Sequence, residues 1–362
     1  MTNAEDDRAL KREILDGIKT REAAIHSLNV RYTATTEFTP WYAEYWRDNF
    51  AGRHQMPWMR WLAKWKTRKM PVGTETCHYD LIAKDGKFAY SCLTEARPPG
   101  RRAPEQGVFD GEVFTVLQDG SQSRASRATG KELLSVLGID QRLYGEFSTM
   151  FGAGHLSARL ATTSEDAGAA SAVGIPADDR SELQGLIELD ASRVSRLASP
   201  EGTEDIVFRV GISHGMGRSA DERSMAVQYT VDVNASKSYW PQRWETNFVY
   251  HAYQGLPEAR CVDRLVELSD FTDVGGLAFP RKLEARDFQY TGPFDLKTSQ
   301  WRNPVGGVTK IDTIAVEEIA INVPVDNSAF VIEFPVGTSF LDLDGNTYVV
   351  NADRSLTNLS NR

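Results

Sequence analysis

The sequence is poor in cysteine, has no long apolar run and carries no excess of positive charge. Three cysteines in 362 residues, Cys77, Cys92 and Cys261, are too few to build a disulfide scaffold. No stretch approaches the ~18 consecutive apolar residues of a membrane-spanning helix, so we expect no transmembrane segment. The formal net charge of −9 opposes binding to phosphate backbones, so we expect no nucleic-acid partner.

Sequence signals for a metal or cofactor are also scarce. No two histidines stand at H-x-H or H-E-x-x-H spacing and C-x-x-C is absent, so we expect no cofactor. A zinc site built from residues distant in sequence is the alternative. Asp342-x-Asp344-x-Asn346 resembles the start of a calcium loop, but its glycine is misplaced and Asp353 holds the twelfth position, which favours a plain β-turn. The six histidines are His26, His54, His78, His155, His214 and His251.

One segment matches a catalytic motif. Gly211-Ile212-Ser213-His214-Gly215 has the G-x-S-x-G spacing of a nucleophile elbow, and an alternating strand pattern precedes it. No amphipathic helix follows, and only His251 remains downstream as a base. A glycine-rich hairpin loop is therefore the favoured interpretation, with a serine hydrolase using Ser213 as a weaker alternative.

The beginning of the chain predicts a helix followed by a strand. Thr2-x-x-Glu5 forms a capping box, and apolar residues then recur at helical spacing. The period changes to two at Asn29, which predicts a strand over Val30–Phe38 with one buried face. The apolar positions of the helical pattern are Leu10, Ile14, Ile18, Ile25 and Leu28.

Most of the remaining chain predicts strands without crossover helices, which indicates antiparallel pairing in a sheet of about eleven strands. Cys77 and Cys92 flank the Asp85-Gly86 turn. Two buried thiols are the favoured interpretation, and a disulfide between them is the alternative. Residues 121–128 read as a Ser/Arg loop, and Thr129-x-x-Glu132 as the start of a second helix. The predicted strands cover 76–83, 87–93, 108–109, 113–117, 205–212, 225–233, 239–250, 262–268, 277–290, 307–321, 330–334, 339–343 and 347–350.

Residues 40–70 form an aromatic and basic insert. It holds five of the eight tryptophans, and Trp58, Trp61 and Trp65 share one helical face with lysine and arginine around them. Such a face suits a membrane interface, an acyl-chain entrance or a partner groove. A structural lid over the sheet is the alternative, and a lid would line the same cavity. The predicted ligand-binding residues are Trp41, Trp46, Trp58, Trp61 and Trp65.

Several segments in order carry a family resemblance. They are Ser27–Tyr32, Phe109–Phe114, Val231–Val233 with Tyr239–Trp244, Gly276–Pro280, and Phe334–Thr338 with the closing hairpin. Their order resembles the LolA/LolB-like superfamily of lipoprotein-localisation factors, in particular the larger outer membrane lipoprotein-sorting protein homologues of bacteria such as planctomycetes. The resemblance implies a curved antiparallel half-barrel whose concave face is covered by helices, with an apolar space that takes acyl chains.

We therefore predict one α+β domain over residues 1–350, with insertions at 40–70 and 121–200 and a polar tail at 351–362. The expected function is non-catalytic binding of a hydrophobic ligand, a lipid or lipoprotein acyl chain, in lipoprotein sorting or envelope maintenance. A protein-interaction or sensor module with a self-filled core is the alternative. The resemblance implies a periplasmic or envelope location and a peripheral envelope partner. The first residues show no apolar signal segment, which leaves the cytoplasm as the alternative.

Overall fold

The computed structural model describes residues 4–41, 73–85, 87–94, 105–110, 113–118, 124–129, 182–198, 204–216, 225–251, 258–291, 294–295, 300–301, 305–342 and 344–359. No helix in these ranges is long and apolar enough to cross a membrane. The helix predicted from Thr129 lies outside them. So does most of the tryptophan insert, of which residues 40 and 41 are described.

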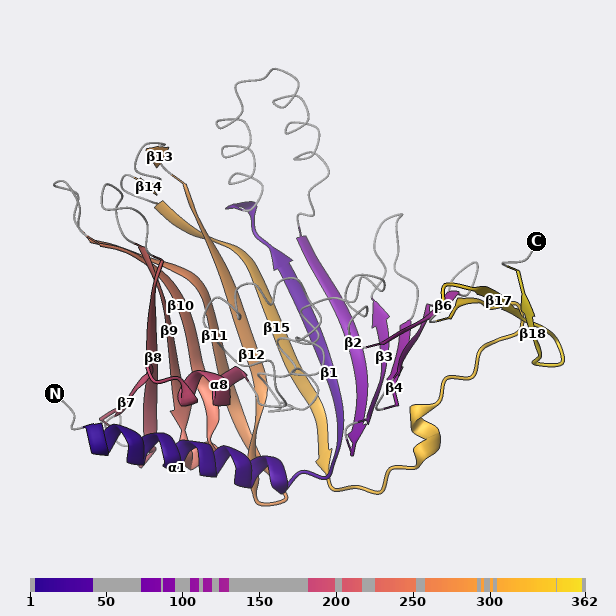
Figure 1. Cartoon of the computed structure of the whole chain (residues 1–362), viewed down its shortest axis with the longest axis horizontal. Coiled ribbons are helices and arrows are strands. Elements are labelled where there is room, and N and C mark those ends of the chain that lie inside the picture. Colours follow the sequence, from indigo (N-terminus) through magenta and orange to yellow (C-terminus); the bar gives the residue numbers. More distant parts are fainter. Residues whose placement is uncertain are drawn as a thin grey trace.

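The architecture is one curved, open sheet with helices on one face (Figure 1). Sixteen strands pair in the order β18-β17-β16-β6-β5-β4-β3-β2-β1-β15-β12-β11-β10-β9-β8-β7, and β13–β14 form a separate two-stranded ladder. The strands are β1 Ser27–Phe38, β2 Gly73–Lys84, β3 Lys87–Thr94, β4 Glu105–Phe109, β5 Val113–Gln118, β6 Arg124–Thr129, β7 Arg193–Arg196, β8 Val207–Met216, β9 Met225–Asn234, β10 Trp240–Tyr250, β11 Ala259–Val274, β12 Leu277–Thr291, β13 Phe294–Asp295, β14 Gln300–Trp301, β15 Val305–Ile321, β16 Ser339–Leu341, β17 Thr347–Val350 and β18 Leu356–Asn358.

The predicted fold class is confirmed: the sheet is mostly antiparallel, curved and not closed. More than eleven strands take part because short strands extend both edges, among them β7 and the β16–β18 group. One pairing is parallel, between β16 and β6. It attaches the C-terminal hairpin to the end of the sheet that the first half of the chain builds.

Helix α1, Ala4–Ala23, forms where the apolar stripe and an acidic first turn predict it. Ile14 and Ile18 are fully buried, and they pack with the short helix α8, Glu182–Glu188, against strands β7–β9. The helix ends earlier than the stripe suggests: Ile25 follows its last residue, and Leu28 already belongs to β1. The helical spacing of apolar residues and the alternation of the following strand overlap between α1 and β1, so the apolar stripe alone could not place the end of the helix.

Three local predictions are wrong. Residues 124–128 of the predicted loop, together with Thr129, form β6, which pairs with β5 and β16. The predicted hairpin loop Gly211–Gly215 lies inside β8 and pairs with β9. The predicted strand Phe330–Phe334 is unpaired, because Asp326 caps a short 3-10 helix, η2 Asn327–Phe330, and the chain runs on to Pro335 without a partner strand.

A connecting strap, residues 322–338, runs from the end of β15 around the sheet to β16 (Figure 1). Its first residue, Asn322, has a left-handed backbone, with φ of 56°. The Asn322 side chain accepts a hydrogen bond from His26 N at 2.8 Å and donates one to Ala24 O at 2.8 Å. Asn322 therefore joins the α1–β1 connection to the start of the connecting strap.

Replacing Asn322 with alanine should destabilise the protein by about 1–3 kcal/mol, because both hydrogen bonds are lost and alanine disfavours a positive φ. Asn322→Gly is the matched control, since it loses the same two bonds but tolerates the backbone. Urea denaturation should rank wild type above Asn322→Gly and Asn322→Gly above Asn322→Ala. Equal midpoints for all three would contradict a bridging role.

Candidate functional site

The helix-bearing face of the sheet is apolar along its central strands. In β1, buried Leu28, Val30 and Tyr32 alternate with exposed Asn29 and Arg31. Neighbouring strands continue this alternation in register. The resulting apolar cluster has sixteen buried members: Leu28, Val30, Tyr32, Tyr79, Leu81, Phe88, Tyr90, Phe109, Trp240, Val266, Leu268, Phe279, Leu283, Ala285, Ile314 and Val316.

Among the described residues, no member of the apolar cluster comes from α1 or α8, whose buried side chains belong to the separate β7–β9 cluster. Tyr32 and Tyr79 stack across β1 and β2 with ring centroids 4.9 Å apart. Burial, with the neighbouring thiols of Cys92 and Cys77, raises the pKa of Tyr79. The Tyr79 hydroxyl therefore stays protonated and adds no charge to the centre of this face.

The apolar face ends at a row of charged residues. Lys310, Asp287 and Arg264 are direct partners across β15, β12 and β11, and they are in register with Phe38 on β1 and Thr246 on β10. By alternation these residues share the face of Ile314, Leu283 and Val266. The Lys310 ammonium contacts Asp312 and lies 3.6 Å from Asp287, and Arg264 lies 3.7 Å from Asp287. We call Lys310, Asp312, Asp287 and Arg264 the ionic row.

Two neighbours complete the ionic row. Thr36 Oγ1 donates a 2.6 Å hydrogen bond to Asp312, which is almost fully buried. Asp263 stands beside Arg264 at the irregularity of the β10–β11 ladder. Burial and the nearby charge of Asp287 raise the pKa of Asp263. Buried charges this close to an apolar surface have to be paired, as they are here.

Only one of the five predicted ligand-binding tryptophans lies among the described residues. Trp41 is half-buried just beyond the ionic row, where its ring packs over Gly307 of β15 and its Nε1 donates to Gln289 O of β12 at 3.3 Å. A Cβ at position 307 would meet the Trp41 ring at 2.4 Å, so glycine permits this contact. Trp46, Trp58, Trp61 and Trp65 lie outside the described residues, and ligand binding by the five stays a prediction.

The C-terminal end of α1 is fixed to the sheet by Arg21. Its Nη1 donates to Tyr239 O at 2.9 Å, and its guanidinium lies 4.1 Å from the centre of the Trp240 ring. Burial lowers the pKa of Arg21 to about 10, with Glu22 acting in the opposite direction, so the group remains charged at neutral pH. Gly17 lets Tyr239 lie against the helix, because a Cβ there would meet the tyrosine ring at 2.3 Å.

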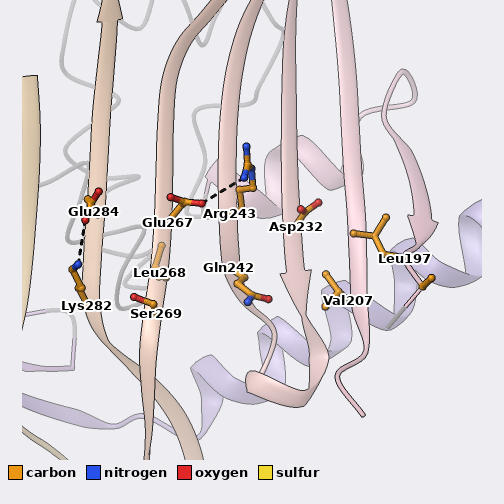
Figure 2. A pocket seen from close by; sticks show the side chains of 11 residues that line it. Leu197, Val207, Asp232, Gln242, Arg243, Glu267, Leu268, Ser269, Lys282 and Glu284 are labelled. Atoms are coloured by element: carbon orange, nitrogen blue, oxygen red, sulfur yellow. Dashed lines mark hydrogen bonds and ion pairs between the residues drawn. The ribbon is translucent and has the colours of Figure 1, made fainter. Parts of the chain in front are cut away.

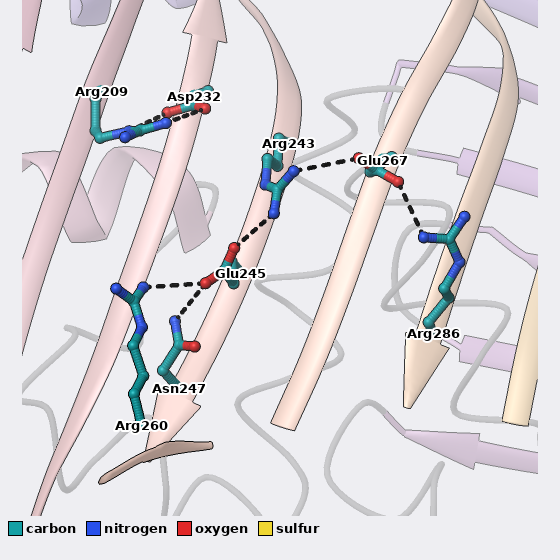
Figure 3. A network of polar contacts seen from close by, with 8 residues as sticks. All are labelled: Arg209, Asp232, Arg243, Glu245, Asn247, Arg260, Glu267 and Arg286. Atoms are coloured by element: carbon teal, nitrogen blue, oxygen red, sulfur yellow. Dashed lines mark hydrogen bonds and ion pairs between the residues drawn. The ribbon is translucent and has the colours of Figure 1, made fainter. Parts of the chain in front are cut away.

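The other face of the sheet carries a network of paired charges over β8–β12 (Figure 3). Arg209 binds Asp232 through two hydrogen bonds of 2.7 and 2.8 Å. Arg243 contacts Glu245 at 2.8 Å and Glu267 at 3.5 Å. Burial acts to raise the pKa of Glu245, but hydrogen bonds from Arg243 and Asn247 outweigh it and lower that pKa. The contacts from Arg260 to Glu245 and from Arg286 to Glu267 complete the network.

A groove of about 560 Å³ lies beside this network (Figure 2). Its charged side chains are ion-paired: Lys282 lies 3.1 Å from Glu284, Arg243 pairs with Glu267, and Asp232 pairs with Arg209 outside the groove. The arrangement is that of a solvated polar face, in which opposite charges neutralise each other across strands. The groove is lined by Leu197, Ala198, Val207, Asp232, Gln242, Arg243, Glu267, Leu268, Ser269, Lys282 and Glu284.

The structure shows the surroundings of each chemical motif that the sequence suggested. Ser213 is exposed within strand β8 and not at a strand-to-helix turn, so the elbow geometry is missing. Gly345 N donates to Asp342 O at 3.3 Å, which confirms the β-turn, and Asp342 Oδ1 accepts hydrogen bonds from the backbone N–H groups of Asp344 and Asn346. No group of three metal-ligating side chains occurs in the described ranges. Cys77 and Cys92 are thiols flanking Tyr79 on β2 and β3.

The ionic row was not predicted from the sequence. Charged residues at alternate strand positions usually face water, which hides such a row among ordinary surface charges. One signal was present in the sequence: Lys310, Asp312, Ile314 and Val316 stand at alternate positions of one strand. Residues at alternate positions share a face of the sheet, so this spacing places two charged residues on the apolar face.

Comparison with known proteins gives matches among solved structures alone. No family model matches the sequence, and no curated protein matches it. A solved LolA superfamily protein from Nitrosomonas europaea is similar over 89% of this chain and 97% of its own, with 12% identity and a TM-score of 0.37. A DUF1329 family protein from Desulfovibrio piger is similar over 88% and 96%, with 8% identity and a TM-score of 0.38.

Proposed function

We propose that this protein binds a hydrophobic molecule, a lipid or the acyl chain of a lipoprotein, without catalysing a reaction on it. The supporting observation is the apolar cluster: sixteen buried side chains on one face of an open sheet, with none contributed by the described helices. The cluster draws on strands from both halves of the chain. The family resemblance of the sequence supports the same function and suggests an envelope location.

The size of this face suits an extended chain. From Leu28 to Ala34 the apolar side of β1 spans about 20 Å at the usual rise of a strand. Burying apolar surface contributes about 25 cal/mol per Å², so an acyl chain needs few polar contacts to bind. Trp41 at the end of the same strands fits an entrance role, because an indole suits a boundary between apolar and polar surroundings.

A large side chain placed on this face should reduce binding. Ala34 is half-buried against the apolar cluster, whereas Thr35, also half-buried, points to the opposite face of β1. Ala34→Phe should weaken the uptake of a fluorescent fatty acid at least tenfold, because the ring occupies space that the ligand needs. Thr35→Phe should leave uptake unchanged, and circular dichroism should show both variants folded.

Native mass spectrometry of protein purified without detergent gives an independent test. We expect bound lipid that is lost on organic extraction and regained on incubation with lipid. A protein that carries no lipid and takes up none, with Ala34→Phe behaving as wild type, would refute the proposal.

A second function is favoured by a different observation. Val30, Phe279 and Leu283 have no exposed surface, as in a core filled by its own side chains. In that case the sheet serves as a protein-interaction or sensor module. This alternative predicts cooperative unfolding at a temperature that delipidation does not change, whereas a carrier should lose stability when its ligand is removed.

A further inference from the structure

The charges on the helix-bearing face separate it into two zones. The apolar cluster occupies the part of β1, β15, β12 and β11 nearer α1, and the ionic row crosses the same strands next to it. The boundary between the apolar cluster and the ionic row falls at Thr36, Asp312 and Ala285, which are direct partners on neighbouring strands. One face therefore offers an apolar track that ends in a line of charged groups.

Exposure within the ionic row increases in one direction. The Asp312 side chain is 5% exposed and Lys310 16%, while Asp287 is 29% and Arg264 40% exposed. The buried carboxylate is neutralised by Lys310 inside the protein. The outermost group is a guanidinium, whose planar set of five N–H donors can bind a carboxylate or a phosphate through two hydrogen bonds.

We propose that the bound molecule is an amphiphile with one anionic group, a carboxylate or a phosphate, which binds Arg264 while the acyl chain lies along the apolar cluster. This inference rests on the proposed function and specifies the ligand class and its direction. Lys310, which is paired with Asp312, also holds Asp287, and Asp287 in turn orients the guanidinium. Asp263 stands beside Arg264, and burial together with the charge of Asp287 raises its pKa.

The test compares three ligands of equal chain length on the full chain: palmitate, a palmitoyl lysophosphatidic acid and hexadecanol. Each displaces an uncharged apolar dye from the protein. We expect the two anions to bind at least tenfold more tightly than hexadecanol, because a charge-assisted hydrogen bond is added. The more tightly bound anion identifies the group as carboxylate or phosphate.

Two arginine variants locate the anion. Arg264→Gln should remove the preference for the anions and leave hexadecanol unchanged. Arg286→Gln is the matched control, because Arg286 is about equally exposed, at 36%, and is ion-paired on the opposite face of β12. It should keep the preference, and salt should weaken anion binding in this control as in wild type.

The outcomes separate this inference from the proposed function. Equal affinity for hexadecanol and the anions, or a preference that survives in Arg264→Gln, would overturn the anionic group while leaving hydrophobic binding intact. Failure of the dye and all three ligands to bind would refute the proposed function itself.

Discussion

Trp240→Ala is expected to lower the free energy of unfolding by about 3–5 kcal/mol, the usual cost of emptying a large buried aromatic site. Trp240 has no exposed surface and packs against Phe279 with ring centroids 5.6 Å apart. Its Nε1 donates to Ala278 O at 2.5 Å, and Arg21 lies over its ring. The substitution therefore removes packing, a hydrogen bond and the contact that holds the end of α1.

Urea denaturation followed by circular dichroism measures this effect. Trp240→Phe is the matched variant: it keeps an aromatic ring but loses the indole N–H, so we expect an intermediate loss of about 1–2 kcal/mol. If Trp240→Ala unfolds within 1 kcal/mol of wild type, the junction between α1 and β10 is not a stability centre.

Lys310→Met is expected to cost about 3 kcal/mol at neutral pH. The substitution removes the ammonium that neutralises Asp312, whose side chain is 5% exposed, and a buried charge without its partner is strongly destabilising. The measurement is the urea midpoint at neutral pH.

Asp312→Asn supplies the control for that prediction. In the double variant Lys310→Met/Asp312→Asn, no buried charge remains unpaired, so it should be more stable than Lys310→Met alone. A double variant less stable than Lys310→Met would show that the two residues contribute independently.

Much of the sheet could be predicted from the sequence because its signals are local. Alternation in β1 and the turns between β2 and β3 and between β9 and β10 fix the neighbouring pairs, and the predicted strands 225–233 and 277–290 match β9 and β12 closely. The stripe through Ile14 and Ile18 likewise gave the buried side of α1.

The elements that were missed depend on distant partners. Residues 124–129 carry a Ser/Arg pattern typical of a loop, and they form β6 because β5 and β16 pair with them. Phe330–Phe334 has strand composition but meets no partner strand, so it stays unpaired. The ionic row was missed for another reason: charged residues at alternate strand positions usually face water, and Lys310 and Asp312 were not read as lying on the face of Ile314.

The order of the strands also constrains how the chain acquires its structure. β1 lies in the middle of the sheet between β2 and β15, and Leu28 pairs with Ile321. A nascent chain can form the β1–β2 and β2–β3 hairpins early, but one edge of β1 stays unpaired until β15 has been synthesised. The high contact order favours slow folding, and the open apolar edge favours association with other chains during that interval. Synthesis of β15 is therefore the step that joins the two parts of the sheet on either side of β1 and ends the period of greatest aggregation risk.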